Sequence, residues 1–283
     1  MDKAHILSIA VTILTLSFNS YSIDIVKLHR QDMSDKKVAH NIAVVRRSLE
    51  VTELEYGAFQ LDLVNVEMSV NRKLISTKNG EIINAVIIPA SQDWDRYNIP
   101  IKVPVRLGLL SYRLLLINKA DLPKFERITT IEQLNVFLAG LVDGWITTEV
   151  YKFNKMKFLE TGHFEGLFLM LAKNRFDYIP RGIYEIYDEL SSRQPLLQDI
   201  VVEPTLALYI PTSSYVYVSP SEPRIAKRIE LGLNKLLTSS ELKTILYQYY
   251  AQEIKRAKLA ERKIFKIKKP YHNKSDIHLF HAN

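Results

Sequence analysis

Arg181 lies in the stretch of sequence whose residues are best suited to bind a ligand. This stretch is RFDYIPRGIYEIYDEL and runs from Arg175 to Leu190. The apolar residues Phe176–Ile179 predict a short buried strand that leads through a proline into a helix. Helix N-termini offer free N–H groups and a positive dipole end, so such junctions in α/β proteins often bind ligands. A guanidinium there can hold a carboxylate or phosphate through two parallel hydrogen bonds. The segment therefore predicts that Arg181 binds an anion; the alternative is a local pair, for instance with Glu185.

Two further arginines are candidates for the same chemistry. Arg113 interrupts the apolar run SYRLLLIN, where a buried charge is costly without a partner. It is therefore expected either to face a ligand cleft or to meet a carboxylate. Arg96 lies in a polar loop, where it either contacts the ligand or is simply solvated. Three arginines together predict an anionic ligand, or an anionic group on a larger one.

Four residues are candidates for the remaining walls of such a site. Trp145, Thr147 and Thr148 combine an aromatic ring with hydroxyl groups at the start of a predicted helix. A core tryptophan followed by ordinary helix capping is the alternative interpretation. Tyr178 is the fourth candidate, and it alternates with Asp177 along a predicted strand, so at most one of the two faces the cleft.

Strand and helix signals alternate along the chain in two units of similar size. The pattern predicts a βαβαβ unit from Ile23 to about Asn118 and a second α/β unit that extends to about Pro211. A last long helix is expected from Glu222 to about Tyr250. We therefore predict an α/β fold with two lobes, each a mostly parallel sheet flanked by helices, and a ligand cleft between them. Lobe 1 comprises residues 23–118 and 212–283, and lobe 2 comprises residues 119–211.

The charge of the chain is concentrated near its C-terminus. The 283 residues carry a formal net charge of +7 and are 47% hydrophobic, an ordinary value for a globular protein. Nine Lys/Arg and one acidic residue lie between Lys255 and Lys274, whereas the rest of the chain has 29 basic and 30 acidic residues. The excess charge is therefore a C-terminal extension from about residue 252 and not a basic face of the protein, so we expect no nucleic-acid partner, because a basic tail without a recognition module is weak evidence for one. We expect the tail instead to be solvated, to lie near a membrane or to pack on a lobe.

The N-terminus has the pattern of a secretory signal peptide. An apolar run of thirteen residues, Ile6–Phe18, is too short to span a bilayer comfortably, and the small residues Ser20 and Ser22 follow it. We predict a signal peptide over residues 1–22 and export to the periplasm, with a buried first helix as the alternative. The absence of cysteine excludes disulfides and thiol chemistry.

An export signal, two α/β units and a late return to the first unit together resemble the type II periplasmic solute-binding proteins (extracellular solute-binding family 3). The resemblance covers Ile23 to Tyr250. In amino-acid-binding members a loop arginine holds the ligand carboxylate, and Arg96 matches it by position. The Phe-Ser-x-Pro-Tyr that usually follows is replaced here by IKVPV. The R-x-D-Y-x-P-R-G run around Arg181, with Arg113 after a Gly-Leu-Leu step, resembles a less characterised branch.

Signals for an enzyme are weak. The sequence has no Gly-x-Ser-x-Gly, no phosphate-binding glycine loop and no His-Glu-x-x-His. Asp93 and Glu185 could serve as acid or base by type, but their spacing does not select them. We predict an exported monomer without metal or cofactor that closes on a small anionic ligand, amino-acid-like or a carboxylate. A membrane permease or sensor would then bind the closed form of the protein. The alternatives are a dehydratase-like enzyme of the same fold and an interaction protein that binds no small ligand.

Overall fold

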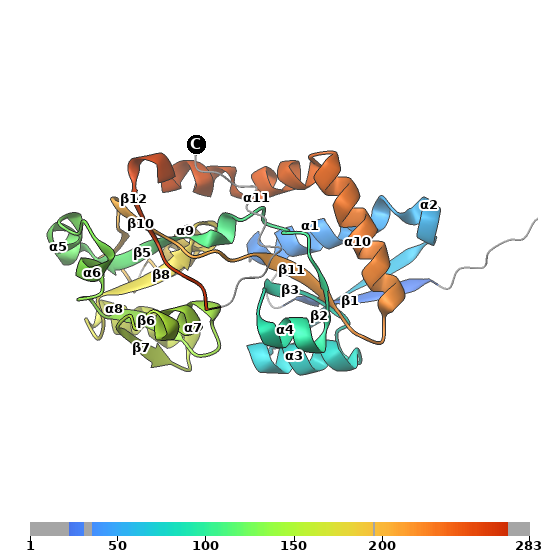
Figure 1. Ribbon diagram of the computed structural model, residues 1–283, viewed down its shortest axis with the longest axis horizontal. Coiled ribbons are helices and arrows are strands. Elements are labelled where there is room, and N and C mark those ends of the chain that lie inside the picture. Colours follow the sequence, from blue (N-terminus) through green and yellow to red (C-terminus); the bar gives the residue numbers. More distant parts are fainter. Residues whose placement is uncertain (1–22, 31–35, 195, 271–283) are drawn as a thin grey trace, which may run out of the picture.

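The computed structural model describes residues 23–30, 36–194 and 196–270, which form two lobes side by side (Figure 1). The predicted signal peptide, residues 1–22, lies outside the described residues. None of the helices in the described ranges is both long and apolar enough to cross a membrane.

The first lobe contains a five-stranded sheet in the order β2-β1-β3-β11-β4. Strand β1 is parallel to β2 and β3, whereas β11 is antiparallel to β3 and β4. Its strands are β1 (Asp24–Arg30), β2 (Phe59–Asn65), β3 (Ala85–Pro89), β4 (Ile99–Ile101) and β11 (Ser214–Val218). The helices of this lobe are α1 (Lys36–Glu50), α2 (Glu53–Tyr56), α3 (Val70–Asn79), α4 (Gln92–Tyr97) and α10 (Pro223–Thr238).

The second lobe contains a seven-stranded mixed sheet in the order β12-β10-β5-β8-β6-β7, with β9 paired to β5. Its strands are β5 (Tyr112–Asn118), β6 (Ala139–Val142), β7 (Phe158–Thr161), β8 (Tyr178–Gly182), β9 (Ile200–Val202), β10 (Leu206–Tyr209) and β12 (Lys263–Lys266). Its helices are α5 (Leu122–Glu126), α6 (Ile131–Leu134), α7 (Ile146–Phe153), α8 (Phe164–Ala172) and α9 (Ile183–Ser191). The two-lobed α/β architecture is thus confirmed, with mixed rather than mostly parallel sheets.

The lobe boundary differs from the expected one at two places. Strand β5 was expected to end lobe 1, but both of its edges pair within the second sheet, with β8 on one side and β10 and β9 on the other. The basic extension was likewise expected in lobe 1, yet β12 pairs in parallel with β10. Hydrogen bonds at the strand edges therefore place residues 112–118 and 263–266 in the second lobe. The chain first passes from lobe 1 to lobe 2 before β5 rather than after it.

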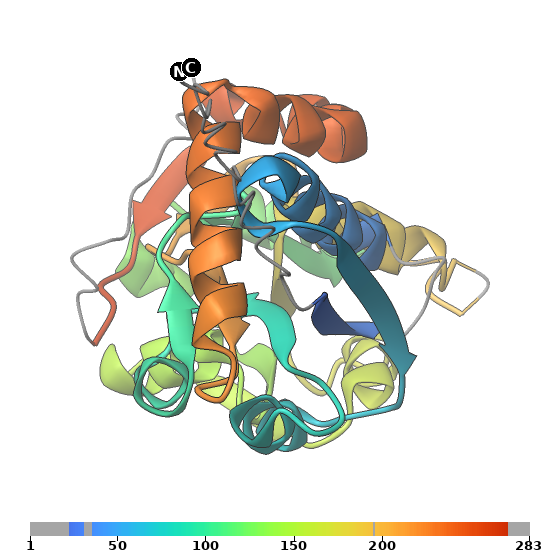
Figure 2. The same cartoon turned by 90° about the vertical axis from the view of Figure 1, so that its right-hand side faces the viewer.

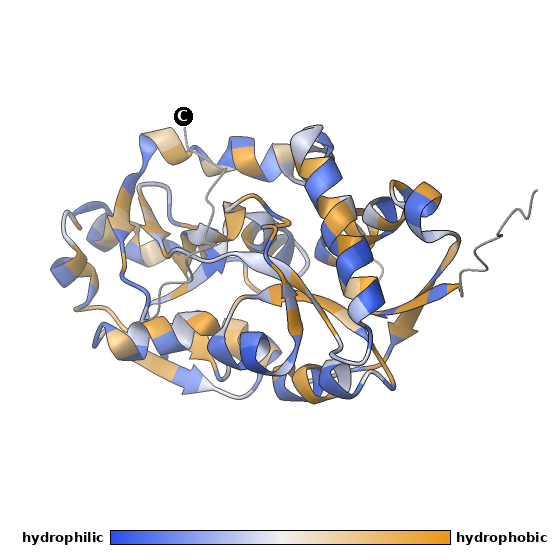
Figure 3. Cartoon of the chain, turned by 45° about the vertical axis from the view of Figure 1, so that its right-hand side comes forward, coloured by the Kyte–Doolittle hydropathy of each residue, from blue (hydrophilic) through white to orange (hydrophobic). Residues whose placement is uncertain are grey.

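The predicted long C-terminal helix is two helices. Pro223–Thr238 forms α10, and Glu241–Ala257 forms α11. Between them Ser240 takes a positive φ of 63°, which breaks the helical path. Orange and blue residues alternate along α10 in Figure 3, as expected for an amphipathic helix packed on a lobe. Helix α11 then lies over the upper side of both lobes (Figures 1 and 2).

The largest hydrophobic core continues from one lobe into the other. It includes Val26 and Leu28 of the first sheet, Leu114 and Ile179 of the second, and Tyr250 of α11. A second core fills the other face of the second sheet, around Leu115, Leu141, Tyr178 and Phe265. The lobes are therefore joined by apolar packing as well as by the connecting segments.

Candidate functional site: an arginine cluster at the junction of the lobes

Arg113 is a buried cation in the second residue of β5. Its backbone pairs with Gly182, the last residue of β8, which places it where that strand passes into α9. The residue is only 3% exposed, and no described residue accepts a hydrogen bond from its Nε atom. Burial lowers the pKa of Arg113 from its ordinary value, against the opposing charge of Glu185, and the positive charge of Arg181 adds to the lowering. A buried guanidinium with an unpartnered N–H is free to bind an anion.

Arg181, in contrast, is fully engaged by the helix that follows it. Its Nε and Nη2 atoms donate to the two carboxylate oxygens of Glu189 at 2.6 and 2.5 Å. Nη2 also lies 3.0 Å from Oε1 of Glu185. The two glutamates follow Arg181 by four and eight residues, so the start of α9 turns both toward it. Burial alone lowers the pKa of Arg181, but these carboxylates outweigh it and raise the pKa above its usual value.

Arg106 connects the two lobes from the segment between β4 and β5. Its Nη2 atom donates to Oδ1 of Asn41 in α1 at 2.6 Å, and its guanidinium lies 4.7 Å from the ring centre of Tyr184 in α9. Tyr184 is buried and is within electrostatic reach of Arg106, Arg113 and Arg181. We call Arg106, Arg113, Arg181, Tyr184, Glu185 and Glu189 the arginine cluster.

The structure brings one further predicted residue to this cluster. Trp145 precedes α7, and the guanidinium of Arg181 lies 4.4 Å from its ring centre. Such stacking suits arginine, whose planar cation is weakly hydrated. Trp145 therefore forms an aromatic wall of the cluster.

The remaining predicted residues lie elsewhere or have local roles. The hydroxyl of Thr148 donates to the carbonyl of Val142 at 2.8 Å, which is ordinary support at a helix start, and Thr147 is buried beside it. Tyr178 lies in the second core, where its hydroxyl is 3.3 Å from that of Tyr151.

Arg96 is exposed on α4 in the first lobe. Its guanidinium lies 5.3 Å from the ring centre of Tyr97, the next residue. Nearby on α4, Asp93 is close enough to Glu149 of α7 to help raise the pKa of that carboxyl, after the larger effect of burial. Helices α4 and α7 thus face one another from the two lobes, as Figure 1 also shows.

Sequence reasoning missed Arg106 and the role of Glu189. Arg106 lies in the irregular segment KVPVRLG, which has no periodicity to show its orientation. Glu189 was detectable, because a glutamate eight residues after an arginine at a helix start lies on the same helix face as one four residues after it.

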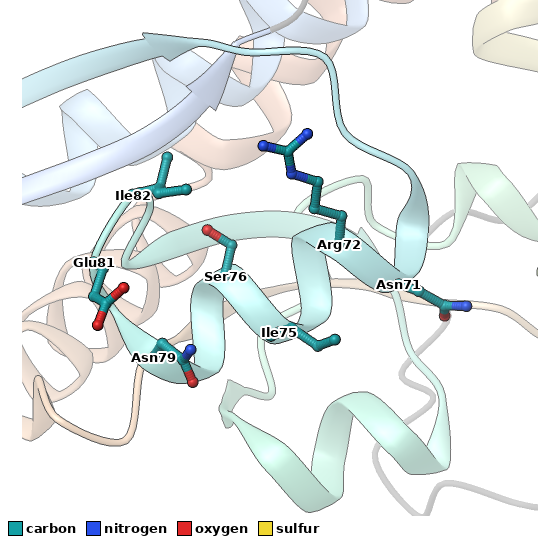
Figure 4. A pocket seen from close by; sticks show the side chains of 7 residues that line it. All are labelled: Asn71, Arg72, Ile75, Ser76, Asn79, Glu81 and Ile82. Atoms are coloured by element: carbon teal, nitrogen blue, oxygen red, sulfur yellow. The ribbon is translucent and has the colours of Figure 1, made fainter.

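Two surface hollows lie apart from the arginine cluster. One, of about 370 Å³, is formed by α3 and the residues after it, where Ile75 and Ile82 are 58% and 42% exposed (Figure 4). It is lined by Asn71, Arg72, Ile75, Ser76, Asn79, Glu81 and Ile82. The other lies near Asn118 and Asp199 in the second lobe. Within the described part of the chain, no group of three or more histidine or carboxylate side chains is placed to hold a metal ion.

Comparison with known proteins gives the fold. No protein-family model matches the sequence, and no curated protein matches it. Solved structures do match in three dimensions. An arginine-binding protein from T. maritima superposes with a TM-score of 0.55 at 14% identity, over 81% of this chain and 96% of that one.

Two other matches come from signalling proteins. The sensor domain of a histidine kinase with similarity to periplasmic binding proteins gives a TM-score of 0.57 at 13% identity, over 81% of this chain and 96% of that one. The ligand-binding core of GluR0, in complex with L-glutamate, gives 0.57 at 13%, over 82% and 99%. The chain therefore has the two-lobed fold of the type II periplasmic amino-acid-binding proteins, as its sequence pattern predicted.

Proposed function

We propose that this chain is an exported solute-binding protein that closes its two lobes on a small anionic organic ligand. The fold supports a binding role, because the similar structures are binding proteins or ligand-sensing domains. The observation that carries the proposal is the state of Arg113, a guanidinium 3% exposed whose Nε has no acceptor among the described residues. A buried guanidinium N–H without an acceptor is costly and is retained most simply for a ligand that accepts from it.

The position of the cluster suits a protein that works by lobe movement. Arg106 contacts α1 of the first lobe and α9 of the second, so a ligand held at Arg113 would lie beside the contact that joins them. Closing the lobes over the anion would exclude water and strengthen each charged hydrogen bond. A permease or a membrane sensor would then recognise the closed form, and the site of action would be the periplasm.

Thermal unfolding with a panel of small organic acids tests this function. The mature chain and an Arg113→Met variant are heated with carboxylates, dicarboxylates, sugar acids and amino acids. A ligand at 100 times its dissociation constant adds about 2.7 kcal/mol to the free energy of unfolding, which gives a clear rise in melting temperature. We expect at least one acid to stabilise the wild type and to have little effect on Arg113→Met.

Other outcomes would favour the two alternative functions. A panel without any stabilising acid would contradict ligand binding and favour an interaction protein of the same fold. Turnover of a cyclic hydroxy acid, followed by its ultraviolet absorbance, would favour a dehydratase-like enzyme.

A further inference from the structure

The carboxylates of the arginine cluster are already neutralised. Glu189 accepts from Arg181 through both of its oxygens, at 2.6 and 2.5 Å. Oε1 of Glu185 lies 3.0 Å from Nη2 of Arg181 and also accepts from the backbone N–H of Gly182 at 3.1 Å. These side chains are only 7–13% exposed, so water does little to weaken the contacts. Neither glutamate is available to a cation that enters the cluster.

The cluster has an excess of positive charge. The cluster holds three guanidinium groups, of Arg106, Arg113 and Arg181, and two carboxylates. Glu185 acts on all three guanidinium groups, whereas Glu189 pairs with Arg181. Lys37 of α1 adds a further positive charge that acts on both glutamates. One ligand carboxylate would accept from the Nε–H of Arg113, which has no acceptor among the described residues, and would offset part of the excess charge. An ammonium group on the neighbouring carbon of the same ligand would be repelled by the arginines and would find no free carboxylate there.

The connection between β10 and β11 carries uncharged polar groups near the start of β5. The backbone of Arg113 pairs with Leu208 of β10, which ends at Tyr209, and the chain then passes through Thr212 and Ser213 to β11, which begins at Ser214. The hydroxyl of Ser111, just before β5, donates to the carbonyl of Thr212 at 3.1 Å and holds this connection near the start of β5. Thr212, Ser213 and Ser214 are buried, and their hydroxyl groups have no hydrogen-bond partner among the described residues. Hydroxyl groups can donate to or accept from a hydroxyl or keto oxygen, but they cannot neutralise an ammonium.

Two exposed carboxylates lie outside this arrangement. After burial, Asp93 of α4 raises the pKa of Glu149 of α7, and Lys152 and Lys269 lower it. No arginine of the cluster is among them. These acidic groups therefore do not compensate the charge at Arg113.

From these charges, and resting on the proposed function, we propose that the ligand is a carboxylic acid without an ammonium on the carbon next to the carboxylate. A 2-hydroxy or 2-keto acid fits the cluster, and the corresponding 2-amino acid does not. This differs from the L-glutamate bound by GluR0, whose structure is similar in fold.

Matched pairs of acids that differ in one group test the inference. L-2-hydroxyglutarate is compared with L-glutamate, and L-lactate with L-alanine, by calorimetric titration of the mature chain. We expect a hydroxy acid to bind with a dissociation constant at least ~10-fold below that of its amino partner. Equal or tighter binding of the amino acid would overturn this inference while leaving a solute-binding function intact. If neither member of either pair binds, and the wider acid panel also has no effect, the proposed function fails and this inference fails with it.

A variant provides an independent test of the physical cause. Arg181→Met releases the carboxylates of Glu185 and Glu189 beside Arg113, and should shift the preference toward the amino acid by at least ~10-fold. Arg181→Lys keeps a positive charge there and is expected to retain the preference of the wild type. If a folded Arg181→Met variant has the same ratio of dissociation constants for amino and hydroxy acid as the wild type, the role assigned to the pairing of Arg181 with Glu185 and Glu189 is contradicted. If that variant does not fold, the matched pairs on the wild type still decide the inference.

Discussion

Arg113 and Arg181 are neighbouring buried arginines with opposite relations to their surroundings. Arg181 is held by two carboxylates and stacks on Trp145, so its charge is satisfied without a ligand. Arg113 is equally buried, but its Nε has no acceptor in the described part of the chain. The sequence analysis named both residues as candidates to bind an anion and ranked Arg181 first. The structure reverses their order, because the partners of Arg181 come from its own helix.

The difference predicts opposite effects on stability. Replacing Arg113 with methionine keeps most of the side-chain volume and removes a buried guanidinium whose Nε–H has no acceptor among the described residues. We expect the ligand-free variant to be as stable as the wild type or more stable by about 1 kcal/mol. Urea denaturation measures this difference. A loss of more than about 2 kcal/mol would show that Arg113 is structural and would count against its role in binding.

Arg181→Met should instead be strongly destabilising. It leaves Glu185 and Glu189 buried without their cation, which costs about 3–5 kcal/mol in comparable buried pairs. The matched control is Glu165→Gln, which removes the exposed partner of Arg193 and should cost less than about 1 kcal/mol. Similar losses in the two variants would refute the account of Arg181 as a satisfied buried cation.

His40 gives the chain a predicted sensitivity to mild acid. Burial among the rings of Tyr249 and Tyr250, together with the charge of Arg106, lowers the pKa of His40 well below 6.5. Below about pH 6.5 the unfolded chain therefore binds a proton that the folded chain does not, and stability falls as the pH falls. The loss from this residue between pH 7.5 and 5 is at most about 2 kcal/mol, the free energy of protonating an imidazole in the unfolded chain over this range.

Denaturation at these two pH values, in the wild type and in His40→Phe, isolates this contribution. The variant should lose less stability on acidification, whereas the exposed His163→Phe should behave like the wild type. The carboxylate of Glu185 acts in a lower pH range, because its pKa is lowered by Arg181, Lys37 and Arg113 against the effect of burial. Equal pH dependence in the wild type and His40→Phe would exclude His40 as the source.

At the scale of elements, strand identity was predictable but strand partners were not. The apolar run of β5 indicated a central strand, yet periodicity does not say which sheet completes it. Hydrogen bonds to β8 and β10 decide this, and both partners are distant in sequence. The same reason explains β12, whose pairing with β10 could not be inferred from its basic composition. The break at Ser240 depends on a single positive φ, a conformation that serine adopts rarely and that helical periodicity does not reveal.

Gly232 fixes the close approach of α10 to α1. A Cβ atom at this position would lie 2.0 Å from the backbone carbonyl oxygen of Ser48. Gly232→Ala should therefore destabilise the protein by several kcal/mol, about 3 or more, although alanine favours helices. Asn234→Ala, on the exposed side of the same helix, should change stability by less than about 0.5 kcal/mol. Thermal unfolding compares them, and a Gly232→Ala variant as stable as Asn234→Ala would show that the helices can separate at no cost.

For the whole molecule, the lobes are connected by more than the two crossings seen in the sequence. Helix α11 leaves the first lobe, packs on α9 and leads into β12 of the second lobe (Figure 1). Lys36 of α1 is paired with Asp188 of α9 at 3.3 Å and also with Glu253 of α11. Lobe movement is therefore expected to be limited on the α11 side and freer between α4 and α7.

The overall architecture was predictable because alternating strand and helix signals leave few ways to bury their apolar faces. The candidate site was predictable only in part. Arg113 and Arg181 lie in neighbouring strands with interpretable spacing, and Trp145, directly before α7, stacks on Arg181. Arg106 lies in an irregular segment, so its position could not be predicted. Tyr178 faces the core, and this could not be predicted because strand alternation does not say which face of the sheet is covered.

The central claim is that Arg113 holds the anionic group of a ligand. Calorimetric titration of the wild type and Arg113→Met, with the acid that gives the largest thermal stabilisation of the wild type, tests it most directly. Loss of a buried charged contact typically costs about 2–5 kcal/mol, so affinity should fall by at least ~30-fold in a variant that remains fully folded. Affinities within about 3-fold of one another would contradict the claim and place the ligand elsewhere.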